Sequence, residues 1–427
     1  MDKFALKSTP SVEREDKVIV KKEWLKVYPQ SNRTGSNFAS NVLFEFQNSG
    51  KQYFYPAESY MVVRLKLVGD LSGSPVLLRD TSGIYPAFNI GANFWSTYSH
   101  QINNTVVDRS DMLPQQDAIN KRLNLTREAK QTWGTVSCLE SNRTLRLRNS
   151  GFDISGVYQG TGIVDLEWRP SLGLFATDDV VPPSCRHLLE FVVHPDYKKR
   201  IVEATSSLTA GSVGHYDANV EEIYFMACMV NVDAPVPNGN HYINFGASEI
   251  SFQSITSTTN NLFFTVKPST RKISTFLQSS LAGTNTIFPP SKFDASGQSL
   301  NLTLVPRQTF GSSQQPNIDI DLKFDNSGAV GQETNFRRAF YDYNQASNYT
   351  TDDVGAEEYI DWRNNLGAVF TYKHDRDPSD TSTTLMVYST LSKTPFDCNL
   401  YVYSEYDRLL NLQYSNGQCV AVMVEDI

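Results

Sequence analysis

Apolar and polar residues alternate with a period of two along much of this chain, and this pattern restricts the fold more than any other feature. Apolar side chains occupy every second position in Met61–Val68, and the segment Ile318–Phe324 alternates more cleanly still. Successive side chains of a β-strand point to opposite faces, so such alternation is typical of a strand with one buried face. Further short β-rich runs lie at Val42–Phe46, Leu188–Val193, Ile223–Val232, Leu262–Val266, Leu300–Leu304, Ala368–Tyr372, Leu385–Tyr388 and Leu400–Tyr406.

Helices play a minor part in the predicted fold. Clusters of Gly, Pro, Ser and Asn separate the β-rich runs, as expected for short strands joined by turns in β-sandwiches. One helical stretch is predicted at Pro114–Trp133 with Asp111 as its cap, although Asn124 and Thr126 weaken its middle, so two shorter helices are equally consistent. A second is predicted at Asn335–Tyr343, where the apolar residues share one face. The sequence therefore predicts an all-β protein.

The length of the chain predicts two domains. A single hydrophobic core rarely grows to 427 residues, so two cores are expected. The Pro- and Gly-containing stretch Asp233–Asn240 would interrupt any strand and is the best boundary. We therefore expect a charge-rich N-terminal arm at residues 1–34, a first sandwich at 35–235 and a second at 236–427, each sandwich with one short helical insertion.

The charge balance argues against a protein that wraps nucleic acid. The chain has 38 basic against 46 acidic side chains, a net charge of −8, whereas neutralising phosphates requires a surplus of Lys and Arg. Lys198, Lys199 and Arg200 form the only tight basic triplet. A solvated turn explains this triplet, and contact with an acidic partner or with packaged nucleic acid is the functional alternative.

No catalytic or metal-binding motif appears in the sequence. The six histidines show no metal-site spacing, and no nucleotide-binding or nucleophile motif is present. Asp319 and Asp321 could act as paired carboxylates, but the outer face of a strand explains them equally well. Five widely spaced cysteines lack a C-x-x-C pair, and neither a signal peptide nor a membrane-spanning segment is found. We expect a protein made inside a cell, with reduced cysteines, no catalytic residues, no metal and no cofactor.

Several segments resemble, in chain order, the double jelly-roll major capsid proteins of the adenovirus–tectivirus lineage. The likeness spans about residues 35 to 427, and the nearest groups are the capsid proteins of Polinton-like viruses, adintoviruses and virophages. A turn followed by a long alternating run resembles an early strand of the family, and a run ending in Tyr-Ser-Glu-Tyr-Asp is similar to its closing strand. The matching segments are Tyr55–Val68, Asn93–Val107, Arg122–Lys130, Leu188–Tyr197, Glu221–Asn231, Asn335–Tyr343 and Leu400–Asp407.

The resemblance implies a structural role in a virus particle. It implies two tandem jelly rolls, a homotrimeric capsomer with a pseudo-hexagonal outline, and an icosahedral shell that encloses a DNA genome. Penton and minor capsid proteins would be further partners, and contact with the packaged DNA would be weak at most. The location implied is the virion, after assembly inside the host cell.

Two other functions remain open from the sequence. A glycan-binding or cell-attachment β-sandwich would use surface aromatic residues as platforms for sugar rings. A minor capsid protein, or a capsid-derived protein retained by a host genome, would keep the same fold in another role.

Overall fold

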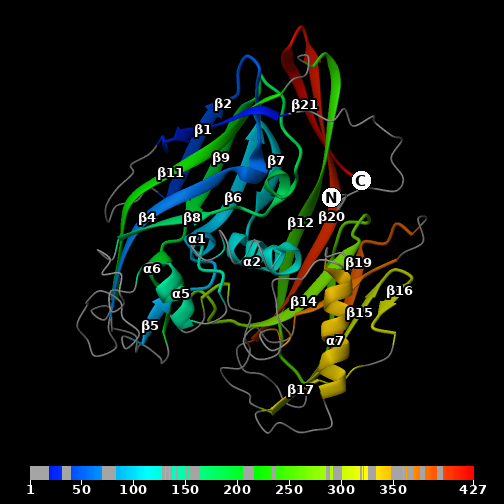
Figure 1. Cartoon of the computed structure of the whole chain (residues 1–427). Coiled ribbons are helices and arrows are strands. Elements are labelled where there is room, and N and C mark those ends of the chain that lie inside the picture. The colour runs from blue at the N-terminus through cyan, green and yellow to red at the C-terminus, as the bar shows by residue number, and fades with distance from the viewer. Residues whose placement is uncertain are drawn as a thin grey trace.

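The computed structural model describes residues 19–30, 40–69, 83–126, 130, 134, 137–140, 143–150, 152, 163–204, 216–232, 237–284, 289–291, 301–317, 320, 322–325, 333–347, 359, 362, 369–375, 380–391 and 398–427. Within these residues the chain forms two β-sandwiches, placed one above the other in Figure 1.

The upper sandwich is a jelly roll. One sheet has the order β1-β11-β4-β8 and the other β2-β9-β6-β7. Taken in chain order, these strands pair first with last, second with seventh, third with sixth and fourth with fifth, always antiparallel. This nested pairing wraps one long hairpin into two sheets, which is the jelly-roll arrangement. The strands are β1 (Ile19–Val27), β2 (Asn41–Gln47), β4 (Tyr60–Gly69), β6 (Trp95–Ile102), β7 (Thr105–Ser110), β8 (Ile163–Trp168), β9 (Arg186–Val193) and β11 (Tyr216–Val232).

The lower sandwich repeats this topology. Its sheets have the orders β12-β20-β14-β18 and β13-β19-β15-β16, with the same nested antiparallel pairs. The strands are β12 (Gly239–Ser254), β13 (Thr259–Thr265), β14 (Lys272–Ser279), β15 (Asn301–Phe310), β16 (Ser313–Gln315), β18 (Phe370–Lys373), β19 (Thr384–Leu391) and β20 (Cys398–Ser415). The remaining strands are β3 (Gln52–Phe54), β5 (Ile84–Pro86), β10 (Val202–Ala204), β17 (Leu322–Asp325) and β21 (Gln418–Asp426).

The strands predicted from alternation are confirmed, with shifted ends. The run Met61–Val68 lies in β4, and Leu400–Tyr406 opens the longer β20. The run Ile318–Phe324 is represented by β17, while Ile318, Asp319 and Asp321 lie outside the described residues. Strand β1 falls within the range predicted for the N-terminal arm, and β12 begins at Gly239, inside the stretch Asp233–Asn240 that was predicted to interrupt any strand.

The helices lie at both predicted places. Helix α7 (Glu333–Ala346) contains the predicted helix Asn335–Tyr343. Helix α2 (Leu113–Asn124) ends at Asn124, one of the two residues expected to weaken the predicted helix. The predicted cap was wrong, because Met112 is the residue before α2 and the Asp111 carboxylate pairs with Arg109 instead. Shorter helices are α1 (Ile90–Asn93), α5 (Arg143–Asn149) and α6 (Tyr197–Arg200), together with the single turns η1 (Pro56–Glu58) and η3 (Gly173–Ala176).

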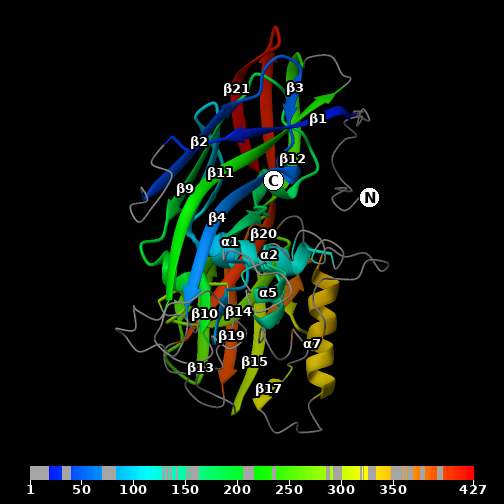
Figure 2. The ribbon, with the colours of Figure 1, turned by 60° about the vertical axis from the view of Figure 1, so that its left-hand side comes forward.

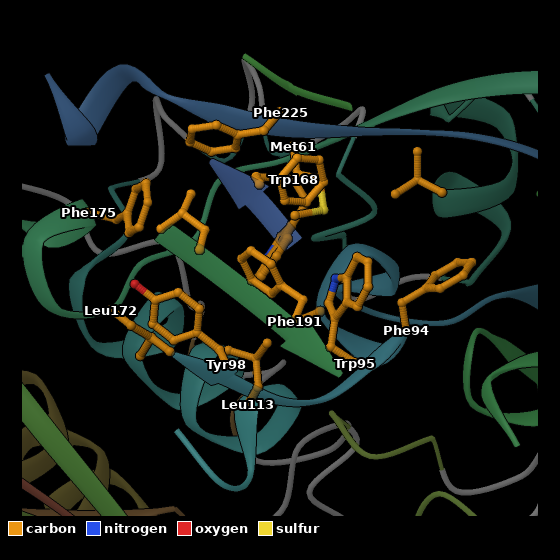
Figure 3. Close-up of a cluster of buried hydrophobic side chains, with 14 of the residues drawn as sticks. Met61, Phe94, Trp95, Tyr98, Leu113, Trp168, Leu172, Phe175, Phe191 and Phe225 are labelled. Atoms are coloured by element: carbon orange, nitrogen blue, oxygen red, sulfur yellow. The ribbon is translucent and has the colours of Figure 1, made fainter. Parts of the chain in front are cut away.

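Aromatic side chains fill the core of the upper roll (Figure 3). The Phe191 ring on β9 lies 5.2 Å from the rings of both Trp95 and Tyr98 on β6, and Trp168 on β8 meets it edge-on at 5.8 Å. All four side chains are at most 2% exposed. Rings at these distances gain about 1 kcal/mol per pair beyond the burial of their area, so this cluster ties the two sheets together.

The two cores share elements from both halves of the sequence. Ile243 and Phe245 of β12 and Leu410 of β20 complete the core of the upper roll. In return, Ile119 and Leu123 of α2 belong to the core of the lower roll. Figure 2 shows α2 lying between the two sandwiches, with α7 beside the lower one. The halves are therefore packed through common strands and a common helix.

Candidate functional site

The basic triplet lies on the short helix α6, directly after the upper-roll strand β9. Lys198 Nζ lies 2.6 Å from Asp217 Oδ1, and Lys199 Nζ lies 3.2 Å from Asp196 Oδ1. Arg200 is only 6% exposed, and burial lowers the pKa of its guanidinium to about 10. Acidic neighbours thus compensate both lysines, and the arginine faces the protein interior. Contact with nucleic acid through these residues stays a prediction.

Helix α2 carries a second cluster of polar side chains, and all of its residues from Leu113 to Leu123 are buried. Asp117 and Lys121 stand one turn apart on this helix, with Lys121 Nζ 2.8 Å from Asp117 Oδ2, and their side chains are 0% and 2% exposed. Asn89, which precedes α1 with φ 53°, donates to Asp117 Oδ2 at 2.8 Å and accepts from Lys121 Nζ at 3.0 Å. The ion pair is therefore enclosed and hydrogen-bonded on both charges.

Further groups of the upper roll donate to the same carboxylate. Trp168 Nε1 on β8 donates to Asp117 Oδ2 at 3.1 Å, and the Ser171 amide and hydroxyl donate to Oδ1 at 3.0 and 2.9 Å. Burial alone would raise the pKa of Asp117, but Lys121, Asn89 and the Ser171 amide outweigh it and hold that pKa below its usual value. Asp117 is therefore a charged anchor that fixes α2 on the upper roll.

The other polar residues of α2 bind the lower roll. Gln116 Nε2 donates to the Ser248 carbonyl at 2.7 Å and to its hydroxyl at 2.8 Å. Asn120 Nδ2 donates to Tyr403 Oη at 3.2 Å, and Tyr343 Oη of α7 donates to the Arg122 carbonyl at 2.9 Å. One helix thus joins both rolls through side chains at neighbouring positions, which fixes how the rolls sit against each other.

A polar groove of about 450 Å³ opens beside this junction, between β7 of the upper roll and β12, β20 and β21. Charged side chains line it, and they pair with one another: Arg408 Nε lies 2.7 Å from Asp426 Oδ1, and Arg109 Nη2 lies 2.8 Å from Asp111 Oδ1. Arg408 also donates to the Val107 carbonyl at 3.2 Å. The fifth charged side chain of the lining, Glu249, lies 3.8 Å from Lys267 Nζ, so each of these five charges has an ion-pair partner.

A buried pair of histidines joins β6 to β9 inside the upper roll. His100 Nε2 lies 3.2 Å from His187 Nδ1, and both side chains are 0% exposed. Burial lowers the pKa of His100 to about 3 and that of His187 well below its usual value. Across the ladder from His100, burial raises the pKa of Asp108 to about 7. Sequence reasoning missed this pair, because 87 positions separate the two histidines.

The described part of the chain offers neither a cluster of metal ligands nor a membrane-spanning helix. No group of three His, Cys, Asp or Glu side chains there is arranged to hold a metal ion. No helix formed by the described residues has the length and apolarity needed to span a membrane.

The architecture is similar to that of several solved structures, although the sequence is not. No protein-family model and no curated protein matches the sequence. A solved structure of the Sputnik virophage contains a chain 13% identical, with a TM-score of 0.58 over all of this chain and 92% of that one. The mavirus major capsid protein is 11% identical, with a TM-score of 0.55 over 100% and 93% of the two chains. A chain of the PBCV-1 virus capsid is 9% identical, with a TM-score of 0.53 over 95% and 99%.

The match extends over whole chains, so it concerns both rolls and their arrangement and not one sandwich alone. Sputnik is a virophage, one of the groups to which the sequence resemblance pointed. The nested strand pairing in each half and the whole-chain similarity to capsid proteins agree: the chain has the double jelly-roll fold of viral major capsid proteins.

Proposed function

We propose that this chain is a viral major capsid protein that forms homotrimers and tiles an icosahedral shell around a DNA genome. The observation that carries the proposal is the pair of jelly rolls locked together through α2. Three copies of such a unit present six similar rolls, which gives a pseudo-hexagonal capsomer suited to tiling. Penton and minor capsid proteins would complete the shell, and the virion is the location that follows.

The oligomeric state tests this proposal. We expect purified protein to scatter light with about three times the 48.0 kDa mass of one chain, or more, and electron microscopy to show trimers or particles. A 48.0 kDa species alone, across a range of protein concentrations and salts, would contradict the trimer. The glycan-binding alternative predicts signals on a glycan array instead, and a minor capsid protein would form particles only when co-expressed with other shell proteins.

The N-terminal residues offer a second test. Deleting residues 1–17 should leave both rolls folded, because β1 begins at Ile19 and pairs with β11. We expect an unchanged melting temperature and fewer or empty particles in electron micrographs, if this segment contacts neighbouring copies or DNA. Deleting residues 1–28 is the control, since it removes β1, leaves one edge of β11 without its partner strand and should lower the melting temperature. Normal, filled particles from the shorter deletion would show that residues 1–17 are dispensable.

The basic triplet should contribute little to DNA binding. In the double variant Lys198→Gln/Lys199→Gln, we expect the affinity for double-stranded DNA to fall less than tenfold, because Asp217 and Asp196 already neutralise the two lysines. The slope of binding against salt concentration should stay nearly constant, whereas loss of two phosphate contacts would reduce it by about 2. Such a reduction, measured by filter binding, would assign DNA contact to the triplet.

A further inference from the structure

Two cysteines distant in sequence meet where the upper roll contacts the terminal hairpin of the lower roll. Cys185 precedes β9 and is fully buried, while Cys419 lies on β21 and is partly exposed. Each thiol is the largest influence on the pKa of the other. Tyr414 lies opposite Cys419 in the β20–β21 ladder, and its hydroxyl is 3.3 Å from Cys185 Sγ.

The backbone around both thiols is fixed by contacts between the two rolls. Tyr414 Oη donates to the Pro183 carbonyl at 3.0 Å, and Ser184 Oγ donates to the Gly417 carbonyl at the hairpin turn at 3.0 Å. On the other side, the Cys185 amide donates to Asn48 Oδ1 at 3.0 Å. The loop that carries Cys185 is therefore held against the hairpin that carries Cys419, with Tyr414 beside both cysteines.

Cys419 differs from the other four cysteines in the acidity of its thiol. The interaction with Cys419 and burial raise the pKa of Cys185 well above its usual value. The interaction with Cys185 is the largest influence on Cys419 and lowers the pKa of its thiol. Burial raises the pKa of Cys138 and of Cys398 to about 12, and that of Cys228 to about 11. Because the thiolate is the nucleophile, oxidation should begin at Cys419 and spare these three.

We propose that Cys185 and Cys419 form an oxidation site, at which hydrogen peroxide converts the two thiols into a disulfide that fastens the terminal hairpin to the upper roll. The Cys419 thiolate attacks one peroxide oxygen, the O–O bond breaks, and hydroxide leaves, giving a sulfenic acid. Cys185 sulfur then attacks the Cys419 sulfur. An S–S bond forms, the S–O bond breaks, and the departing hydroxide takes up the Cys185 proton as water. In total two thiols are oxidised and one peroxide is reduced to two waters.

The disulfide would close a long loop between the two halves of the chain. Restricting the unfolded state in this way stabilises the folded one, and longer loops give larger effects. We expect oxidation to raise the melting temperature by about 3 °C or more. The site depends only on contacts within one chain, so the inference does not rest on the proposed capsid role.

Peptide mapping of the full-length chain tests the proposal. After treatment with hydrogen peroxide and alkylation of the remaining thiols, we expect a linked peptide pair that contains Cys185 and Cys419, lacks two hydrogen atoms and separates on reduction. The variants Cys419→Ser and Cys185→Ser should lack this pair, and Cys185→Ser should accumulate the sulfenic acid at Cys419, where dimedone traps it. The matched control Cys398→Ser should form the disulfide as the unaltered protein does.

Three results would overturn the proposal. They are recovery of both cysteines as alkylated thiols after peroxide, a disulfide that joins a different pair of cysteines, and a link that forms only between two chains. The mapping on the unaltered protein decides between these outcomes even if one of the serine variants fails to fold.

Discussion

Replacing Lys121 with methionine is expected to lower the free energy of unfolding by about 3–5 kcal/mol. The substitution retains an unbranched side chain one heavy atom shorter but leaves the Asp117 carboxylate, 0% exposed, without its counter-charge. Asn89, Trp168 and Ser171 still donate to that carboxylate, but they supply partial charges only. Urea denaturation followed by tryptophan fluorescence measures the loss, and Trp168 itself reports on the site.

Lys199→Met is the matched control for this effect. Lys199 also pairs with an aspartate on the same turn of a helix, but the two side chains are 46% and 51% exposed. Exposed pairs of this kind contribute about 0–1 kcal/mol, so the control should change stability little. Equal losses in Lys121→Met and Lys199→Met would show that the buried pair is not an anchor.

The double variant Asp117→Asn/Lys121→Met separates charge from packing. It removes both charges and retains an amide that can still accept the hydrogen bond from Trp168. Because no buried charge is left uncompensated, it should be more stable than Lys121→Met alone. A double variant that is less stable than Lys121→Met would instead assign the stabilisation to the carboxylate and its donors.

Alternation predicted the strands because each sheet has a buried face and a solvated one. It failed for β1, where Lys21, Lys22, Glu23 and Lys26 predicted an arm. Strand β1 pairs with β11 at the edge of its sheet, and most of its described side chains are exposed on both faces. Edge strands commonly carry lysine, which discourages pairing with other chains. Because the prediction relied on alternating apolar residues, it could not detect a strand made mostly of charged ones.

The role of α2 could be predicted only in part. Its apolar residues Ala118, Ile119 and Leu123 appeared at helical spacing and are buried, as expected. Its polar residues would ordinarily face water, yet Gln116 and Asn120 are buried because the second roll closes over them. A single sequence gives no signal for a helix covered on both sides, since the lower-roll strands that cover it come from positions more than 100 residues away.

Acidification from pH 7 to pH 5 is expected to destabilise the protein through His100 and His187. In the unfolded chain these side chains take up protons below a pKa of about 6.5. In the folded protein burial keeps His100 neutral down to about pH 3 and lowers the pKa of His187 as well. The unfolded state therefore gains protons first, and each histidine lowers the free energy of unfolding by about 2 kcal/mol at pH 5.

Asp108 acts in the opposite direction. Its folded pKa is raised to about 7 by burial, so the folded protein takes up a proton between pH 7 and pH 5 while the unfolded chain, with a pKa of about 3.9, does not. This proton stabilises the folded state by about 2 kcal/mol on acidification and offsets one of the two histidines. The three groups together should therefore cost about 2 kcal/mol between pH 7 and pH 5.

The Asp108→Asn variant tests this balance, because it removes the compensating group and leaves both histidines in place. Its loss of stability between pH 7 and pH 5, measured by urea denaturation at each pH, should roughly double to about 4 kcal/mol. His100→Gln should reduce the loss in the otherwise unaltered protein to nearly zero, since the remaining histidine and Asp108 then cancel. The comparison uses the dependence on pH and not the absolute stability, so the packing defect of each substitution drops out. Equal pH dependence in all three proteins would mean that these buried groups do not control the response to acid.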